Sequence, residues 1–335
     1  MKRLLNLSRF KEVVSALPSA NVMVVGDLML DEFVWGEVER ISPEAPVPVV
    51  WVREETSMPG GAANVARNIS SLGGNAILCG VVGKDHYARR LLSLLKKEGV
   101  DIREVITSSS RPTTVKTRIV AHNQQVVRID REEVLDLSDA EESQLLENIF
   151  ARLDDVSAVI IEDYGKGVIS QSFLSKLIPE VHRRGKIVTV DPKRDHFTFY
   201  KGADVITPNR KELSEAVGRK LVSMEEVDEA ARQLMRKLSL KGLLVTLSEE
   251  GMKLYTRGSA VHIPTAAREV FDVSGAGDTV IATFTMARCI GADPVEAAVL
   301  SNVAAGVVVG KVGVAVCSVE ELVSHFGEIY EEVAV

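Results

Sequence analysis

The chain lacks the features that mark several large classes of protein. Its three cysteines are scattered over 335 residues with no CxxC pair, which argues against a disulfide framework or zinc site and favours a reducing compartment. Because 40 Lys and Arg stand against 47 Asp and Glu, for a net charge of −7, nucleic acid is not expected as a partner. No apolar run approaches the roughly 18 residues that span a bilayer, and charges interrupt the N-terminal segment before it forms a signal peptide. We therefore expect a cytoplasmic protein without membrane contact.

Common nucleotide and metal motifs are also missing. No Gly-Lys pair is followed by Ser or Thr, so the P-loop pattern GxxxxGK[ST] is absent, and Gly275-Ala-Gly277 does not continue as GxGxxG. A dinucleotide-dependent dehydrogenase is therefore disfavoured. No HExxH occurs, and the six histidines never fall into the spacing of metal ligands.

The chain does contain a regular alternation of short β-branched runs and longer amphipathic segments, and 46% of its residues are hydrophobic, enough for a sizeable core. The expected strands are 22–25, 76–82, 158–161, 187–190, 204–206 and 243–247. The expected helices are 85–98, 140–153, 171–184, 224–238, 276–290 and 294–309. Continuous apolar strands separated by helices predict an α/β fold with a mostly parallel central sheet and helices on both faces.

Two stretches break this rhythm. Residues 33–53 contain three prolines, which exclude a helix interior, and residues 113–131 have the pattern of a hairpin with Lys116 and Arg118 on one face. Together they predict a small β-sheet lid over the mouth of the main sheet. Such a thin sheet exposes apolar residues such as Trp51, so we expect a homodimer that covers the lid. The alternative is two independent surface hairpins.

The strongest chemical signal is the segment DVSGAGD, residues 272–278, which precedes a helical pattern. The small residues Gly275, Ala276 and Gly277 let backbone amides converge where the helix begins, which makes an anion site for a phosphate oxygen. Asp278 shares this space, and a carboxylate beside a phosphate is explained if it is the general base for an attacking hydroxyl. Alternatively, Asp278 only complements the helix dipole and the glycines form a turn.

The second signal is the segment GGAANVARNISSLGG, residues 60–74. Gly60 and Gly61 open a helix with exposed backbone donors, and the Asn64 amide, one turn further on, can bind a hydroxyl. A tightly packed helix start with a solvent-facing amide would have the same pattern.

These two segments, in this order and roughly 200 residues apart, resemble the two signatures of the ribokinase (PfkB) family of carbohydrate kinases. The resemblance extends over about residues 20–325 and implies a ribokinase-like fold, with 1–335 as a single kinase domain and the lid inserted in it. It implies ATP and Mg²⁺ as cofactors, Asp278 as catalytic base, the Gly275–Gly277 backbone as anion hole and Asn64 as a sugar ligand. K⁺ activation, known in this family, would use backbone oxygens near Asp272.

Shorter motifs look like the heptose-7-phosphate kinase branch of that family. They are GDLMLD at 26–31, RISPEAPVPV at 40–49, NQQ at 123–125, DYGKG at 163–167 and TPNRKE at 207–212. The resemblance implies phosphorylation of the anomeric (C1) hydroxyl of D-glycero-β-D-manno-heptose 7-phosphate, on the route to ADP-heptose and lipopolysaccharide. Members of the branch often continue into a nucleotidyltransferase with an HxGH motif. This chain has no HxGH, so it resembles the stand-alone kinase or the kinase part.

The charges expected near the cleft also favour a phosphorylated sugar, because a sugar phosphate needs cations whereas a neutral sugar needs mainly hydroxyl partners. The candidate phosphate ligands are Lys116, Arg118, Arg128, Lys166 and Lys193, each of which can equally be a solvated charge. Asp27 and Asp31 follow the first strand at its carboxyl end and should accept hydrogen bonds from sugar hydroxyls, although Asp31 can equally cap a turn. The remaining sugar ligands are expected to be Gly60, Gly61, Asn64 and Gln125.

Two further segments are expected to contact the nucleotide. Asn209, Arg210, Lys211 and Glu212 match the family's NxxE element, which positions the nucleotide phosphates and, through water, Mg²⁺ at Glu212. The same pattern is an ordinary capping box before a helix. The segment LLVTLSEEG resembles the strand and loop beside the nucleotide, which would place Thr246, Ser248 and Gly251 near ribose and phosphate and Asn302 beside the adenine. The alternative functions are a kinase for another sugar or sugar phosphate and a catalytically silent nucleotide-binding module.

Overall fold

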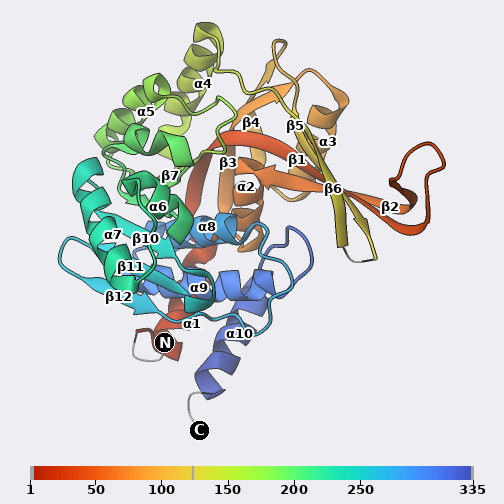
Figure 1. Cartoon of the computed structure of the whole chain (residues 1–335). Helices are drawn as coiled ribbons and strands as arrows, with labels where there is room; N and C mark the ends of the chain where they lie inside the picture. The colour runs from red at the N-terminus through yellow and green to blue at the C-terminus, as the bar shows by residue number, and fades with distance from the viewer. Residues whose placement is uncertain (1–3, 123, 333–335) are drawn as a thin grey trace.

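The structure, a computed structural model, describes residues 4–122 and 124–332 (Figure 1). Its strands form one twelve-stranded sheet, and the body of the sheet has the order β12-β11-β10-β9-β8-β7-β1-β3-β4. The strands are β1 (Asn21–Ile41), β2 (Pro48–Gly61), β3 (Asn75–Gly83), β4 (Asp101–Ser108), β5 (Thr114–Ala121), β6 (Gln124–Arg131), β7 (Ala158–Glu162), β8 (Ile187–Asp191), β9 (Val205–Ile206), β10 (Gly242–Thr246), β11 (Met252–Thr256) and β12 (Ala260–Ile263). The body pairs are parallel except β10–β11 and β11–β12, which confirms the expected mostly parallel sheet.

Helices cover both faces of this sheet, and each face has its own hydrophobic core. The helices are α1 (Leu7–Ala16), α2 (Ala62–Ser71), α3 (His86–Lys97), α4 (Asp139–Arg152), α5 (Gln171–Arg183), α6 (Arg210–Val217), α7 (Met224–Leu238), α8 (Ala276–Cys289), α9 (Pro294–Val309) and α10 (Val319–Glu332). The first core contains α1, α2, α3, α8, α9 and α10, and the second contains α4, α5, α6 and α7. Among the described residues no helix is both long and apolar enough to cross a membrane.

The expected strands and helices are present with ends shifted by a few residues, with one large exception. The expectation that the first strand ends at residue 25 is wrong, because β1 continues to Ile41. Its body part pairs with β3 only as far as Asp27. Three strands near the two ends of the sheet body, β4, β11 and β12, were not expected. Charged residues interrupt β4 and β11, and β12 has only four residues, one of them a histidine.

The outer part of β1 is the spine of the lid. From Leu28 onward it pairs with β2 in antiparallel fashion, and from Met29 onward with β5 in parallel, while β6 extends the sheet beyond β5. Figure 1 shows these strands projecting from one side of the body. The alternative of two independent hairpins is therefore wrong, since both excursions are strands of one sheet. Asn123, at the expected hairpin turn, lies outside the described residues.

The lid exposes large apolar side chains. Trp51 is 59% exposed, and the others are Ile41, Val47, Val52, Val126, Val127 and Ile129. Large exposed apolar patches on a folded protein commonly mark contact surfaces.

Candidate active site

Asp278 and Asn64 meet at the junction of two helix starts. Gly275 precedes α8 with a φ of 77°, in the left-handed region that favours glycine, so the helix begins with Asp278 in its first turn. Asn64, in the first turn of α2, donates a hydrogen bond from Nδ2 to Asp278 Oδ2 at 2.7 Å. Both side chains are buried. The structure therefore joins the two sequence signatures in one polar pair.

Tyr164 is the third member of this group, and sequence reasoning did not assign it to the site. It follows β7, and its hydroxyl donates to Asp278 Oδ1 at 3.1 Å. The Lys116 ammonium from the lid lies 5.2 Å from the centre of the Tyr164 ring. Its place in the DYGKG motif directly after a buried strand was the available signal.

The environment of Asp278 favours a base that can accept a proton near neutral pH. Burial raises the pKa of Asp278 to about 6, while the hydrogen bonds from Asn64 and Tyr164 oppose the rise. Burial also raises the pKa of Tyr164 well above its usual range, so its hydroxyl stays protonated and remains a donor. A carboxyl group with such a pKa suits general-base catalysis.

The loop before α8 is held in place by Asp272. Its Oδ1 accepts from Ser274 N at 2.9 Å and its Oδ2 from Gly313 N at 3.1 Å. A Cβ atom at Gly275 would lie 2.9 Å from Asn64 Nδ2, closer than real contacts allow, so glycine leaves the space that the Asn64–Asp278 bond occupies. The backbone of Gly275, Ala276 and Gly277 is thus fixed at the amino end of α8, beside Asp278, where an anion is favoured.

Two further carboxylates, from buried Glu162 and half-buried Asp191, lie beside Asp278. Glu162 is the last residue of β7 and Asp191 the last residue of β8. One carboxylate oxygen from each of Glu162, Asp191 and Asp278 lies within 4.8 Å of the other two. Both oxygens of Glu162 are buried, and neither accepts a hydrogen bond from an N–H or a hydroxyl group of the described residues. Burial, followed by repulsion between neighbouring carboxylates, raises the pKa of Glu162 and Asp191 well above their usual range. Such a cluster needs protons or a cation, and its oxygen donors fit Mg²⁺.

Glu212, expected to bind Mg²⁺ through water, faces the same region. After burial, repulsion from the Glu212 carboxylate is the next cause that raises the pKa of Asp191, so the charge of Glu212 acts on this cluster. One oxygen of Glu212 is already used, because Oε2 accepts from Asn209 N at 2.8 Å in a capping box. Both interpretations of the NxxE segment are therefore compatible with the structure. Glu162 and Asp191 were missed, although each is an acidic residue at the end of a buried strand.

Asp31 lies on the lid part of β1. Arg118 donates from Nη1 to Asp31 Oδ1 at 2.5 Å, and the carboxylate occupies the space that a Cβ at Gly60 would take. The idea that Asp31 caps a turn is wrong, since β1 continues through it with Met58 and Lys116 as strand neighbours. Gly61, with a φ of 58°, makes the junction between β2 and α2.

The expected cations gather where the lid meets the DYGKG loop. Partial burial lowers the pKa of Lys116. Lys166 Nζ lies 2.6 Å from Glu132 Oε1, and Lys193 packs against Gly165. Arg128, opposite Arg118 in the lid, is paired with Asp130 at 2.8 Å. Gln125 is not in this group, because it lies on exposed β6 nearer the tip of the hairpin, opposite Val120.

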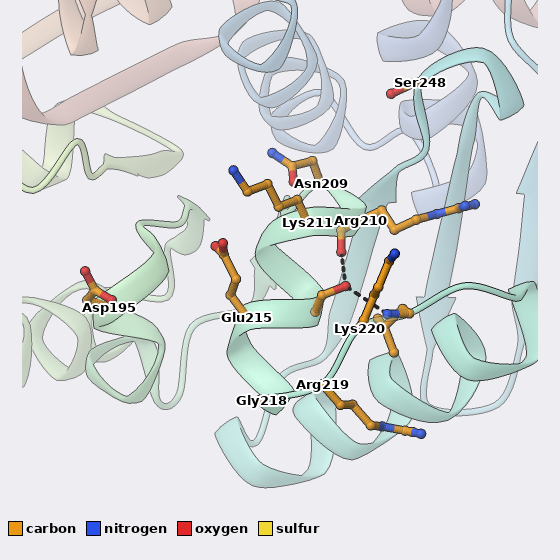
Figure 2. Close-up of a pocket in the computed structure, with 11 residues that line it drawn as sticks. Asp195, Asn209, Arg210, Lys211, Glu215, Gly218, Arg219, Lys220 and Ser248 are labelled. Atoms are coloured by element: carbon orange, nitrogen blue, oxygen red, sulfur yellow. Dashed lines mark hydrogen bonds between the residues drawn. The ribbon is translucent and has the colours of Figure 1, made fainter.

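Four of the nucleotide candidates border a hollow of about 900 Å³ at the start of α6, namely Asn209, Arg210, Lys211 and Ser248. Figure 2 shows Asn209 and Lys211 at the start of α6 and Ser248 on the turn across from them. Arg210 also lines this hollow and pairs with Glu250 at 2.5 Å. The hollow is thus rich in polar and cationic groups, which suits a phosphate-bearing ligand.

Three further nucleotide candidates have structural roles in the same region. Thr246 ends β10 and its N–H donates to Pro208 O at 3.0 Å, next to Asn209. Gly251 has a φ of 84°, and any side chain there would collide with the backbone at Ile263. Asn302 Nδ2 donates to Pro264 O at 2.7 Å, so part of its amide is engaged by a loop.

Known structures share this ribokinase-like fold. Ribokinase from Arabidopsis thaliana, solved with ribose and ATP, aligns with a TM-score of 0.73 at 20% identity, over 91% of this chain and 98% of that chain. Phosphofructokinase-2 from Escherichia coli, solved with substrates and products, aligns with a TM-score of 0.79 at 20% identity, over 93% and 99%. At these identities the likeness is one of fold.

The sequence comparisons go further. The model of the pfkB family carbohydrate kinases matches residues 19–321, and the chain belongs to this family. The Bifunctional protein HldE of Paramagnetospirillum magneticum is 47% identical over 318 residues, which are 95% of this chain and 65% of that protein. The protein of the same name from Mesorhizobium japonicum is 47% identical over 309 residues, 92% of this chain and 62% of that protein. The chain therefore spans less than two thirds of the length of these relatives.

Proposed function

We propose that the protein is an ATP-dependent kinase that phosphorylates the anomeric (C1) hydroxyl of D-glycero-β-D-manno-heptose 7-phosphate, in ADP-heptose and lipopolysaccharide biosynthesis. The observation that carries the proposal is the buried Asp278 beside Asn64 at the glycine-led start of α8. The family membership supports a sugar kinase. The heptose-kinase motifs and the identity to the HldE proteins support the heptose substrate.

In this mechanism Asp278 accepts the proton of the C1 hydroxyl as the sugar oxygen attacks the γ-phosphorus of ATP in line. The bond between the γ-phosphorus and the β,γ-bridging oxygen breaks, and ADP leaves. The backbone amides of Gly275–Gly277 donate to the phosphoryl oxygens and stabilise their charge. Mg²⁺, when bound with ATP, supplies positive charge to the phosphates, and Glu162, Asp191 and Glu212 are the residues suited to hold it. Lys211 and Ser248 border the hollow that we assign to the nucleotide.

The sugar phosphate would lie under the lid. Asp31 accepts from sugar hydroxyls and is itself oriented by Arg118. Lys116, Arg118, Lys166 and Lys193 come from the lid and from two loops of the body, a convergence that suits a phosphate remote from the reacting hydroxyl. Closure of the lid would keep water, a competing acceptor, out of the site.

Two further features belong to this proposal. The exposed apolar residues of the lid are covered in a homodimer formed through the lid. K⁺ binds backbone oxygens near Asp272, in the loop that leads to the anion hole; a phosphofructokinase-2 of the same fold has been solved with potassium.

A coupled assay of ADP release tests the substrate. Purified protein with ATP and Mg²⁺ is offered heptose 7-phosphate, fructose 1-phosphate, fructose 6-phosphate and the unphosphorylated sugars. Heptose 7-phosphate should give by far the highest kcat/KM. A clear preference for another sugar would make the protein a different carbohydrate kinase, and no turnover with any of them would favour a silent nucleotide-binding module.

A further inference from the structure

Asp27 is buried where β1 leaves the body sheet, and its carboxylate faces backbone amides. Oδ2 accepts from Tyr164 N at 2.9 Å and Lys166 N at 3.0 Å, and Oδ1 accepts from Val168 N at 3.2 Å. The residue is only 1% exposed. A sugar hydroxyl would have to compete with three amide donors that come from a single loop, residues 164–168.

Asp163, the residue just before this loop, also holds it. Its Oδ1 accepts from Gly165 N at 2.7 Å. Its Oδ2 accepts from the Tyr200 hydroxyl at 2.7 Å and lies 2.7 Å from His196 Nδ1. Two buried carboxylates, those of Asp27 and Asp163, therefore fix this loop by accepting hydrogen bonds from its backbone amides.

The loop carries Tyr164 to the catalytic carboxylate. The Tyr164 hydroxyl donates to Asp278 Oδ1, and Asn64 donates to Asp278 Oδ2. With one donor on each oxygen, rotation of the carboxylate about its Cβ–Cγ bond would break both hydrogen bonds. The direction of the lone pair that receives the substrate proton is therefore set by these two donors.

We propose that Asp27 and Tyr164 are positioning residues that act in series on the catalytic base. Asp27 holds the 164–168 loop through its backbone amides, and the loop holds the Tyr164 hydroxyl against Asp278. This assigns Asp27 a role different from the sugar contact expected from its place after the first strand, and leaves that contact to Asp31. The kinetic part of the inference rests on the proposed kinase function.

The kinetic test is the separation of kcat from the KM for the sugar phosphate. Tyr164→Phe and Asp27→Asn should each lower kcat on the order of tenfold with the KM for the sugar nearly unchanged, since each loses hydrogen bonds that orient the base. Asp31→Asn should mainly raise that KM. Because the first two residues act in series, the double variant should lose little more activity than the worse single variant. A raised KM with normal kcat in Asp27→Asn, or additive losses in the double variant, would overturn the proposal.

Tyr255→Phe is the matched control. The Tyr255 hydroxyl donates to Asp228 Oδ1 at 2.6 Å, so this variant also removes a tyrosine–aspartate hydrogen bond, but between β11 and α7. It should lower the melting temperature and leave kcat unchanged. If its kcat falls as far as that of Tyr164→Phe, the effect of Tyr164 is general destabilisation and the proposal is wrong.

A structural readout works even if the enzyme acts on no sugar tested. Crystal structures of the wild type and Asp27→Asn, both without ligands, should show the Tyr164 hydroxyl within hydrogen-bonding distance of Asp278 only in the wild type. An unmoved Tyr164 in the variant would overturn the series arrangement. Absence of turnover in the wild type would instead count against the proposed function alone.

Discussion

Asn64 and Asp278, 214 residues apart in sequence, are joined by a hydrogen bond of 2.7 Å. One residue starts α2, at the end of the lid strand β2, and the other starts α8. The bond therefore connects α2, the helix that follows the lid strand β2, to α8, whose first backbone amides form the candidate anion hole. Because β2 leads directly into α2, a displacement of β2 that moves Asn64 would change this hydrogen bond to Asp278.

Replacement of the base is the most direct test of the site. Asp278→Asn keeps the shape of the side chain but removes its ability to take a proton, so kcat should fall by a factor on the order of 10² or more. ATP binding, measured by calorimetry, should remain close to that of the wild type. Near-normal turnover in this variant would refute the assignment of Asp278.

The raised pKa of Asp278 makes a prediction about stability. The folded protein holds the proton with a pKa of about 6, against an ordinary value of 3.8. The folded state therefore binds more protons than the unfolded state in this range, and this carboxyl group costs stability as pH rises through 6. In metal-free protein, the stability of the wild type relative to Asp278→Asn should increase by about 1 kcal/mol from pH 7.5 to pH 5. Urea unfolding at the two pH values measures the difference, and no change would show that the pKa is not raised.

The cationic residues of the lid should affect binding of the sugar phosphate but not binding of the nucleotide. Lys116→Met and Arg118→Met remove charge while keeping most of the aliphatic length, so the KM for the sugar phosphate should rise by about tenfold or more, with little change in the KM for ATP. Arg183→Met is a suitable control, because its ion pair with Glu180 lies within α5 and involves neither the lid, the DYGKG loop nor the hollow assigned to the nucleotide. Equal effects on both substrates would contradict a phosphate subsite under the lid.

The carboxylate cluster predicts how the protein binds a divalent cation. Mn²⁺, used as a probe for Mg²⁺ and followed by electron paramagnetic resonance, should bind the wild type in the presence of ATP. Glu162→Gln should weaken this binding at least severalfold, because it removes a carboxylate whose two oxygens accept no hydrogen bond from an N–H or a hydroxyl group of the described residues. Unchanged Mn²⁺ affinity would indicate that Glu162 is instead held as a neutral acid.

The exposed lid predicts the oligomeric state. Trp51→Glu places a charge on the apolar surface of β2, so a dimer that covers this surface should dissociate. Light scattering at micromolar concentration should report a dimer for the wild type and a monomer for the variant. A monomeric wild type would remove the homodimer from the proposal.

The inner strands of the body were predictable because they are nearly continuous apolar runs, as buried parallel strands are. The lid was predictable as β structure, but the length of β1 was not, since Asp27 and Asp31 read as the end of a strand. Only the tertiary structure shows that Asp27 is satisfied by amides of a loop 137 residues or more further along the chain. Asp278 and Asn64 were proposed from local chemistry. Tyr164, Glu162 and Asp191 lie at or just after the ends of buried strands, but only the tertiary structure shows that they are neighbours of Asp278.

The long strand β1 has a mechanical consequence. The strand β1 is an inner strand of the body and also the strand of the lid to which β2 and β5 pair, with no loop between these two parts. The lid therefore has no hinge loop in β1 about which it could rotate as a rigid body. It moves instead by bending and twisting of β1 near Leu28 or at the register shifts after Trp35 and Val38. Opening for substrate entry should thus be small in amplitude and elastic, with the restoring force stored in the strand itself.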